Sequence, residues 1–340
     1  MREVIASIDS WLADNEAVAL ATVVQTWGSA PRREGAKMAL TPAGHIAGSV
    51  SGGCVEGAVY EAGTETLATG RGQLLSFGVA DETAWDVGLA CGGKIRVFVE
   101  PLDIDHYQKV RQLVQDDRPG ARATIISGPV ENVGRTLFLA GGEIAGHTLP
   151  ENLVNPVYTA TKAALARSRP EQIRLESMEI FIDVLLPAPT LILVGGVHIA
   201  IALAQMARTV GFRTIVVDPR RAFGSDARFP DADRLIQAWP DKAFAELQLN
   251  QSTAVVMLTH DPKIDDPALK TVLPSPAFYI GALGSTRTHV QRRERLLAAG
   301  VSAEQVDRIH APIGLDIGAQ TPEEIAVAVL AEIVAVRRAA

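Results

Sequence analysis

The sequence predicts an α/β protein built from two parts. The first is an N-terminal α+β region with an internal duplication, and the second is a C-terminal doubly wound parallel sheet. Short segments recur between residues 19–102 and 121–187, whereas after residue 187 buried apolar strands alternate with helical patterns. Such alternation is typical of parallel sheets covered by helices on both faces. We therefore place the domains at residues 1–186 and 187–340.

The composition narrows the classes of function. The formal net charge of −7 and the lack of a basic tail argue against nucleic-acid binding. The N-terminus lacks the basic-then-apolar layout of a signal peptide, and the longest apolar stretch, 325–336, is too short to span a membrane. The two cysteines are too few for a disulfide framework, so we expect reduced thiols and a cytoplasmic location.

The N-terminal region repeats one pattern of strands and helix. Gly44-His45-Ile46-Ala47-Gly48 returns as Gly142-Glu143-Ile144-Ala145-Gly146, and Val97-Phe98-Val99-Glu100 anticipates Ile180-Phe181-Ile182-Asp183. Each copy then reads strand, strand, strand, helix, strand, which fits an α+β layer structure. The glycine-rich, cysteine and arginine features lie in the first copy only. That asymmetry is expected of a single ligand site on a two-fold-like framework.

The stretch Ser51-Gly52-Gly53-Cys54 is the most informative of these features, and Asn152 takes the place of Cys54 in the second copy. The stretch follows a strand–turn–strand pattern over 37–50 and precedes an amphipathic helix over 55–69. Unpaired N–H groups and the helix dipole at such a turn stabilise negative charge. They favour the thiolate, which is a nucleophile and a soft metal ligand. The structural alternative is a small buried cysteine that fills a tight turn.

The second region begins with the pattern of a dinucleotide-binding turn. The apolar strand 190–194 runs into Gly195-Gly196-Val197-His198-Ile199-Ala200, and the next strand, 214–218, ends in Asp218. This context predicts a Rossmann-like fold in which the glycine turn and Asp218 would hold a dinucleotide. Val197 occupies the position of the second glycine, where its side chain should obstruct the approach of a pyrophosphate. We therefore expect a repurposed cleft rather than bound NAD(P).

Further candidate ligand-binding residues lie near the carboxyl ends of the strands, where parallel sheets bind ligands. His260 follows one strand and could donate a proton or contact a phosphate, although a turn closed with Asp261 is the alternative. Gly284 and Ser285 open a helix and offer an anion cradle, unless Ser285 only caps that helix. His198 beside the glycine turn either points into the same crevice or belongs to the core.

Together these stretches resemble the XdhC/CoxI family, the accessory factors of xanthine dehydrogenase and related molybdenum hydroxylases. They follow the family's order over nearly the whole chain, so the match is more specific than any one motif. The matching stretches are Gly28-Ser29-Ala30-Pro31-Arg32-Arg33, Gly48-Ser49-Val50-Ser51-Gly52-Gly53-Cys54-Val55-Glu56, Cys91-Gly92-Gly93, Thr259-His260-Asp261-Pro262-Lys263, Gly281-Ala282-Leu283-Gly284-Ser285 and 310–318.

The resemblance implies an N-terminal XdhC/CoxI region, a C-terminal Rossmann-like domain and often a homodimer. It further implies that the protein binds the molybdenum cofactor (molybdopterin), supports its sulfuration and delivers it to a client such as xanthine dehydrogenase. A cysteine desulfurase is the candidate sulfur donor. A protein with this role is a cofactor chaperone and not itself a catalyst.

The chemistry of the residues fits this role. The cofactor is an anionic pterin that bears a phosphate and a metal-bound dithiolene. The backbone N–H groups of Ser51-Gly52-Gly53 suit its anionic groups, as do Arg32 and Arg33. Cys54 suits a position close to the molybdenum–sulfur centre as a thiolate. Cys91 joins it if the duplicated framework brings the two loops together.

A second function stays open at this point. The chain could be an NAD(P)-dependent oxidoreductase that uses the cleft near Gly195, Asp218 and His260. Val197 weighs against this alternative, for the steric reason given above.

Overall fold

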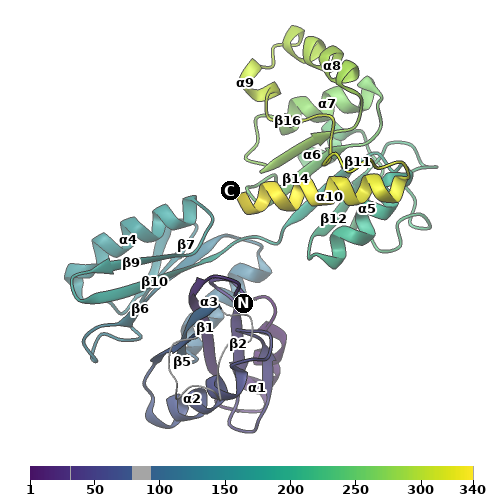
Figure 1. Cartoon of the computed structure of the whole chain (residues 1–340). Coiled ribbons are helices and arrows are strands. Elements are labelled where there is room, and N and C mark those ends of the chain that lie inside the picture. The colour runs from purple at the N-terminus through teal and green to yellow at the C-terminus, as the bar shows by residue number, and fades with distance from the viewer. Residues whose placement is uncertain (31, 79–92, 340) are drawn as a thin grey trace. The chain divides into compact units, whose positions relative to one another are not determined.

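The computed structural model describes residues 1–30, 32–78 and 93–339. It divides into two compact units, Met1–Pro187 and Ala188–Ala340 (Figure 1). The first is built of antiparallel sheets and the second of one parallel sheet. This confirms the predicted fold class, an α+β region followed by a Rossmann-like sheet.

The first unit contains two five-stranded sheets with matching strand orders, β3-β2-β1-β5-β4 and β8-β7-β6-β10-β9. This equality confirms the internal duplication. The strands of the first sheet are β1 (Ala19–Trp27), β2 (Lys37–Leu40), β3 (Ile46–Gly48), β4 (Gln73–Phe77) and β5 (Lys94–Pro101). Those of the second are β6 (Gly120–Ser127), β7 (Thr136–Ala140), β8 (Glu143–His147), β9 (Glu171–Leu175) and β10 (Met178–Leu185).

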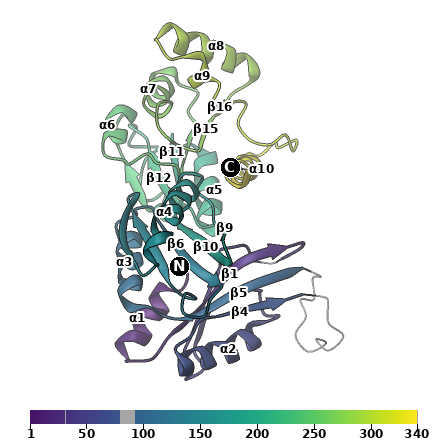
Figure 2. The ribbon, with the colours of Figure 1, turned by 90° about the vertical axis from the view of Figure 1, so that its left-hand side faces the viewer.

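One long helix packs against each sheet of this unit. Helix α2 (Glu56–Thr69) buries Val59 against the core of the first sheet, and α4 (Glu151–Ala166) buries Val157 against that of the second. Figure 2 shows α2 alongside β1, β4 and β5. The opposite face of the first sheet carries a smaller core shared by α1 (Ile5–Ala13) and α3 (Ile104–Gln115). Alternate residues of each strand thus serve two different cores, as the period of two requires.

The second unit is a six-stranded parallel sheet of order β13-β12-β11-β14-β15-β16. Its helices cover both faces, because α5 and α10 share one buried core and α6, α7 and α8 share the other. The chain order reverses between β11 and β14, which is the switch point where such sheets bind ligands. Within the described ranges, none of the helices is both long and apolar enough to cross a membrane.

Strands and helices of the second unit largely alternate along the chain. The strands are β11 (Thr190–Val194), β12 (Arg213–Val217), β13 (Arg234–Ile236), β14 (Thr253–Met257), β15 (Tyr279–Ala282) and β16 (Ile309–His310). The helices are α5 (His198–Thr209), α6 (Pro240–Ala245), α7 (Pro262–Val272), α8 (Thr286–Ala298), α9 (Ala303–Val306) and α10 (Pro322–Ala339).

Candidate functional site

The loop before α2 is organised by one carboxylate. The helix begins at Glu56, and the side chain of Glu56 turns back into the preceding loop. Its two oxygens accept hydrogen bonds from two hydroxyl groups and five backbone N–H groups. The donors are Ser49 Oγ, Ser51 Oγ and the N–H groups of Val50, Ser51, Gly52, Gly53 and Val55.

This arrangement corrects one prediction from the sequence. The N–H groups of Ser51, Gly52 and Gly53 were expected to hold an anionic group of a ligand, but they surround the Glu56 carboxylate instead. Partial burial raises the pKa of Glu56, yet the hydrogen bonds from Ser49 and Ser51 outweigh it and bring that pKa to about 2. The carboxylate is therefore a permanent internal anion of the loop at neutral pH.

Cys54 lies in this loop with its side chain exposed. The alternative of a buried cysteine that fills a turn is therefore wrong. The positive φ angles of Gly52 (81°) and Gly53 (121°) form the turn that precedes it, a backbone conformation that favours glycine. In the second copy α4 already begins at Glu151, so Asn152 lies in the first helical turn and that copy has no equivalent loop.

The other predicted residues of the first copy lie in different surroundings. The Arg32 guanidinium contacts the Glu3 carboxylate, with Nη2 2.5 Å from Oε1 and 2.7 Å from Oε2. Arg33 is exposed. Cys91 lies outside the described residues. Among the described residues, no cluster of three or more His, Cys, Asp or Glu side chains could hold a metal ion.

The predicted dinucleotide turn of the second unit is already occupied by the protein. Asp218 is fully buried, and its Oδ2 accepts from the N–H of Gly196 at 2.7 Å and from Arg220 Nη2 at 2.8 Å. Burial raises the pKa of Asp218, but the hydrogen bonds from Arg220 and Gly196 keep it below its usual range. The acid expected to bind a ribose is thus ion-paired within the chain, which corrects the role predicted for it.

The backbone also covers the glycine turn. A Cβ placed on Gly196 would stand 2.3 Å from the carbonyl oxygen of Phe223, so this segment fits against the turn only because residue 196 is glycine. Arg228 donates from Nη2 to the Gly196 carbonyl at 3.0 Å and lies over the Phe223 ring. Val197 is the N-cap of α5 and packs against the core. The segment around Phe223 therefore lies where a dinucleotide would approach.

We expect that replacing Val197 with glycine does not create a site for NAD(P). The substitution removes the side chain but leaves Asp218 bonded to Arg220 and leaves Phe223 over Gly196. Calorimetric titration with NAD(H) and NADP(H) should show no binding at millimolar ligand for either the unchanged chain or Val197→Gly. Saturable binding by Val197→Gly would mean that the covering segment moves aside readily.

The remaining predicted residues stand at the carboxyl end of the parallel sheet. His260 follows β14 in the left-handed region, with φ of 59°, a conformation that costs energy in a residue with a Cβ. Ser285 caps α8 by accepting from Thr288 N–H, next to Gly284 with φ of 137°. The side chain of His198 is 72% exposed and lies 3.6 Å from Glu323, so the alternative of a core histidine is wrong.

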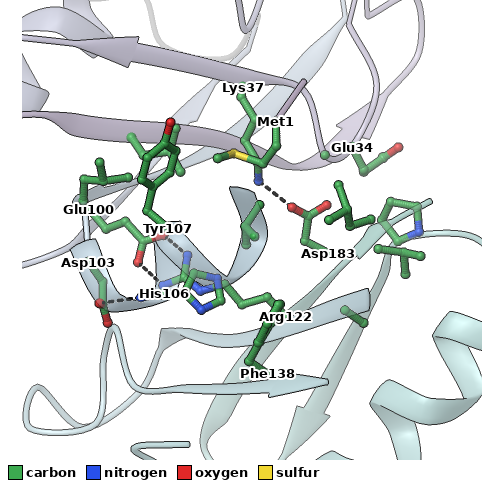
Figure 3. A pocket seen from close by; sticks show the side chains of 18 of the residues that line it. Met1, Glu34, Lys37, Glu100, Asp103, His106, Tyr107, Arg122, Phe138 and Asp183 are labelled. Atoms are coloured by element: carbon green, nitrogen blue, oxygen red, sulfur yellow. Dashed lines mark hydrogen bonds and ion pairs between the residues drawn. The ribbon is translucent and has the colours of Figure 1, made fainter. Parts of the chain in front are cut away.

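A polar cavity of about 180 Å³ in the first unit is lined by side chains that the sequence did not single out (Figure 3). Two ion pairs border it, and each joins the two sheets. Lys37 Nζ on β2 lies 2.6 Å from Asp183 Oδ2 on β10 and donates to Thr22 Oγ1 at 2.9 Å. Arg122 on β6 holds both oxygens of Glu100 on β5.

The duplication contained a signal for this cavity. Glu100 and Asp183 end the matching segments Val97-Phe98-Val99-Glu100 and Ile180-Phe181-Ile182-Asp183, where each acid follows an apolar run. In the strand register Glu100 of β5 lies opposite Leu20 of β1, and Asp183 of β10 lies opposite Arg122 of β6. A carboxylate at this position of a strand needs a nearby cation. Glu100 of the first copy takes Arg122 from the second, and Asp183 of the second copy takes Lys37 from the first.

Comparison with known proteins identifies the family. The model of the XdhC and CoxI family matches residues 11–78, and that of the XdhC Rossmann domain matches residues 191–333. A Bacillus subtilis (strain 168) protein named as a probable xanthine dehydrogenase subunit is 33% identical, over 97% of this chain and 96% of that protein. The chain belongs to the XdhC/CoxI family.

Two further similarities extend over nearly the whole XdhC/CoxI chain. The Escherichia coli (strain K12) molybdenum cofactor insertion chaperone PaoD is 27% identical, over 96% of this chain and 85% of that protein. A Bacillus halodurans crystal structure described as a xanthine dehydrogenase has a TM-score of 0.75 at 25% identity, covering 98% of this chain and 96% of that one. Cys54 lies inside the first family match, and Asp218 and Ser285 lie inside the second.

Proposed function

We propose that this protein is an accessory factor that binds molybdenum cofactor, supports its sulfuration and delivers it to a xanthine dehydrogenase-type molybdenum hydroxylase. The names of two relatives, a cofactor insertion chaperone and a probable subunit of xanthine dehydrogenase, support this role. The observation that carries it is the exposed thiol of Cys54 on a loop fixed by Glu56. That loop exists in only one of the two copies, as a single site requires.

The residues present fit part of the cofactor. When bound, the cofactor supplies a molybdenum–sulfur centre, and an exposed thiolate is a suitable soft neighbour for it. The phosphate is held elsewhere than on the loop N–H groups, because Glu56 already receives them. Arg33, which is exposed, is a candidate for that contact. In this proposal Cys54 also meets the sulfur donor, a cysteine desulfurase, because only an exposed thiol can reach a partner protein.

The covered glycine turn favours this proposal over a nicotinamide-dependent oxidoreductase. Hydride transfer needs a bound dinucleotide, and both the acid and the glycine turn that would hold it are engaged by Arg220 and Phe223. In this proposal the second unit therefore has no part in hydride transfer. Homodimer formation and a cytoplasmic location belong to the same proposal.

Cys54→Ala should reduce the molybdopterin content of the purified protein at least tenfold. The protein is prepared without oxygen from molybdenum-replete cells, and the pterin is measured by fluorescence after acid oxidation. Asn152→Ala is the matched control, since it changes the equivalent position of the other copy and should leave the content unchanged. Absence of pterin from the unchanged protein would overturn the proposed function, and full content in Cys54→Ala would remove the role given to the thiol.

A further inference from the structure

The charges around the cavity of the first unit disfavour an anionic group inside it. Four carboxyl groups line it, those of Glu34, Glu100, Asp103 and Asp183, against the side-chain cations of Lys37 and Arg122. The Met1 amino group lies here too, but burial and Lys37 lower its pKa to about 6, so it is largely uncharged at neutral pH. Burial raises the pKa of Asp183, but Lys37 more than compensates and holds it below its usual range, so the carboxylate stays ionised. Burial and the nearby Arg122 lower the pKa of His106 to about 2, so its imidazole is neutral. An added anion would meet an excess of negative charge.

Two side chains that line the cavity, Arg122 and His106, carry hydrogen-bonding nitrogen atoms. Arg122 uses Nη1 and Nη2 on Glu100, whereas its Nε is buried and has no partner among the described residues. The neutral His106 ring offers one donor and one acceptor and is held edge-on to Phe138, with ring centroids 4.7 Å apart. The ring nitrogens of His106 are therefore available to a ligand or to ordered water in the cavity.

Asp183 presents its second oxygen on the side of Gly35. Oδ2 is bound by Lys37, while Oδ1 would lie 3.1 Å from a Cβ on Gly35, whose φ is 86°. A side chain at residue 35 would therefore crowd this oxygen. A carboxylate with one cation-bound oxygen still has lone pairs that can accept from neutral donors. An amino group beside a ring N–H presents two parallel N–H donors to such a carboxylate.

The size and walls of the cavity suit a flat ring system. A volume of about 180 Å³ leaves room for several ordered waters or for one small ring system. Apolar side chains close it between the polar groups, among them Leu20, Val110, Phe138 and Leu185. Figure 3 shows Phe138 beneath the Arg122 and His106 side chains, with the Lys37–Asp183 pair above.

We propose that this cavity binds an uncharged fused-ring nitrogen heterocycle through a 2-amino-4-oxo edge, the edge that pterins and guanine share. The amino group and ring N–H donate to Asp183, and the His106 ring meets a remaining nitrogen or oxygen atom of the heterocycle. The identification of this heterocycle as the pterin of molybdenum cofactor rests on the proposed function. The recognition of the edge itself does not.

The test uses three soluble probes on the full chain. Pterin and 9-methylguanine carry the 2-amino-4-oxo edge, while lumazine has the pterin rings with oxygen in place of the amino group. Binding is measured by pterin fluorescence and by calorimetry. Pterin should bind at least tenfold more tightly than lumazine. Binding of 9-methylguanine as tight as that of pterin would identify the edge alone as the determinant, and weaker binding would identify the pterin rings as well.

Two variants of the cavity and one matched control locate the site. His106→Phe keeps the aromatic contact with Phe138 but removes the ring nitrogens, and Asp183→Asn removes the charged acceptor. Glu179→Gln alters another ion pair between the two sheets, that with Arg96, which does not line the cavity. Both cavity variants should weaken pterin binding at least tenfold, with Glu179→Gln unchanged. Circular dichroism establishes whether each variant is folded. If Asp183→Asn does not fold, His106→Phe alone tests the site.

The outcomes separate this inference from the proposed function. Equal binding of pterin and lumazine, equal binding by His106→Phe and the unchanged chain, or no binding of any probe at millimolar concentration would overturn the inference and indicate a cavity filled by water only. The proposed function would then still stand on the cofactor content of the purified protein and its loss in Cys54→Ala. Pterin binding by a chain that carries no molybdopterin in cells would support the inference and contradict the proposed function.

Discussion

Replacing Glu100 with glutamine is expected to lower the free energy of unfolding of the first unit by about 3–5 kcal/mol. Glu100 and Arg122 hold each other through two hydrogen bonds, one of them 2.9 Å between Nη2 and Oε2. Only 9% of the Glu100 side chain and 14% of the Arg122 side chain are exposed. Without the carboxylate, the guanidinium stays buried but loses the charge to which it is hydrogen-bonded, and this is the source of the lost stability. Urea unfolding followed by circular dichroism measures the change.

Glu171→Gln provides the control for this measurement in the same unit. Glu171 pairs with Arg167, whose side chain is 50% exposed, four residues earlier in the chain. Exposed pairs of this kind contribute about 0.5 kcal/mol or less, so this variant should unfold almost as the unchanged protein does. Similar losses in Glu100→Gln and Glu171→Gln would show that the pair between the sheets is solvated and not buried.

Replacing Glu56 with glutamine is expected to lower the free energy of unfolding by about 1–3 kcal/mol at neutral pH. It should also make the free energy of unfolding less dependent on pH in the acidic range. The carboxylate receives seven hydrogen bonds from the Cys54 loop, and the neutral amide cannot accept all of them. Its pKa of about 2 lies below the ordinary 4.5. A depressed pKa stabilises the fold above the ordinary value, and this stabilisation is lost as the pH falls from about 4.5 through about 2.

Urea unfolding between pH 6 and pH 2 tests this prediction. The unchanged chain should lose stability over that range more steeply than Glu56→Gln. Glu61→Gln, an exposed position on the same helix, should follow the unchanged chain. Parallel pH profiles for the unchanged chain and Glu56→Gln would mean that the loop does not depend on the carboxylate.

The sequence predicted the architecture well because the architecture depends on patterns that recur. The duplicated segments predicted corresponding strands in the two copies, and the structure confirms equal strand orders in the two sheets. The apolar strand 190–194 and its glycine turn likewise predicted the parallel sheet, which is confirmed. Both signals come from residues close together in the chain, where hydrophobic period and turn residues are informative.

The details of the candidate site were harder to predict because they depend on side-chain pairing. Glu56 was part of a helix pattern, and nothing in its spacing showed that its carboxylate would turn back into the loop of Gly52 and Gly53. Arg220 lies only two residues from Asp218, yet the sequence shows neither its pairing with that acid nor the approach of Phe223 to the glycine turn. The ion pair between Lys37 and Asp183 joins distant segments, so it becomes visible only when the two sheets are in place.

Transfer of the cofactor to a client enzyme tests directly whether this protein is a carrier. The anaerobically purified protein is mixed with a cofactor-free xanthine dehydrogenase-type hydroxylase, and the hydroxylase activity that appears is compared for the unchanged chain, Cys54→Ala and Asn152→Ala. We expect activity with the unchanged chain and with Asn152→Ala, and at least tenfold less with Cys54→Ala. A hydroxylase that gains no activity from the loaded, unchanged chain would contradict the assignment of this protein as a carrier.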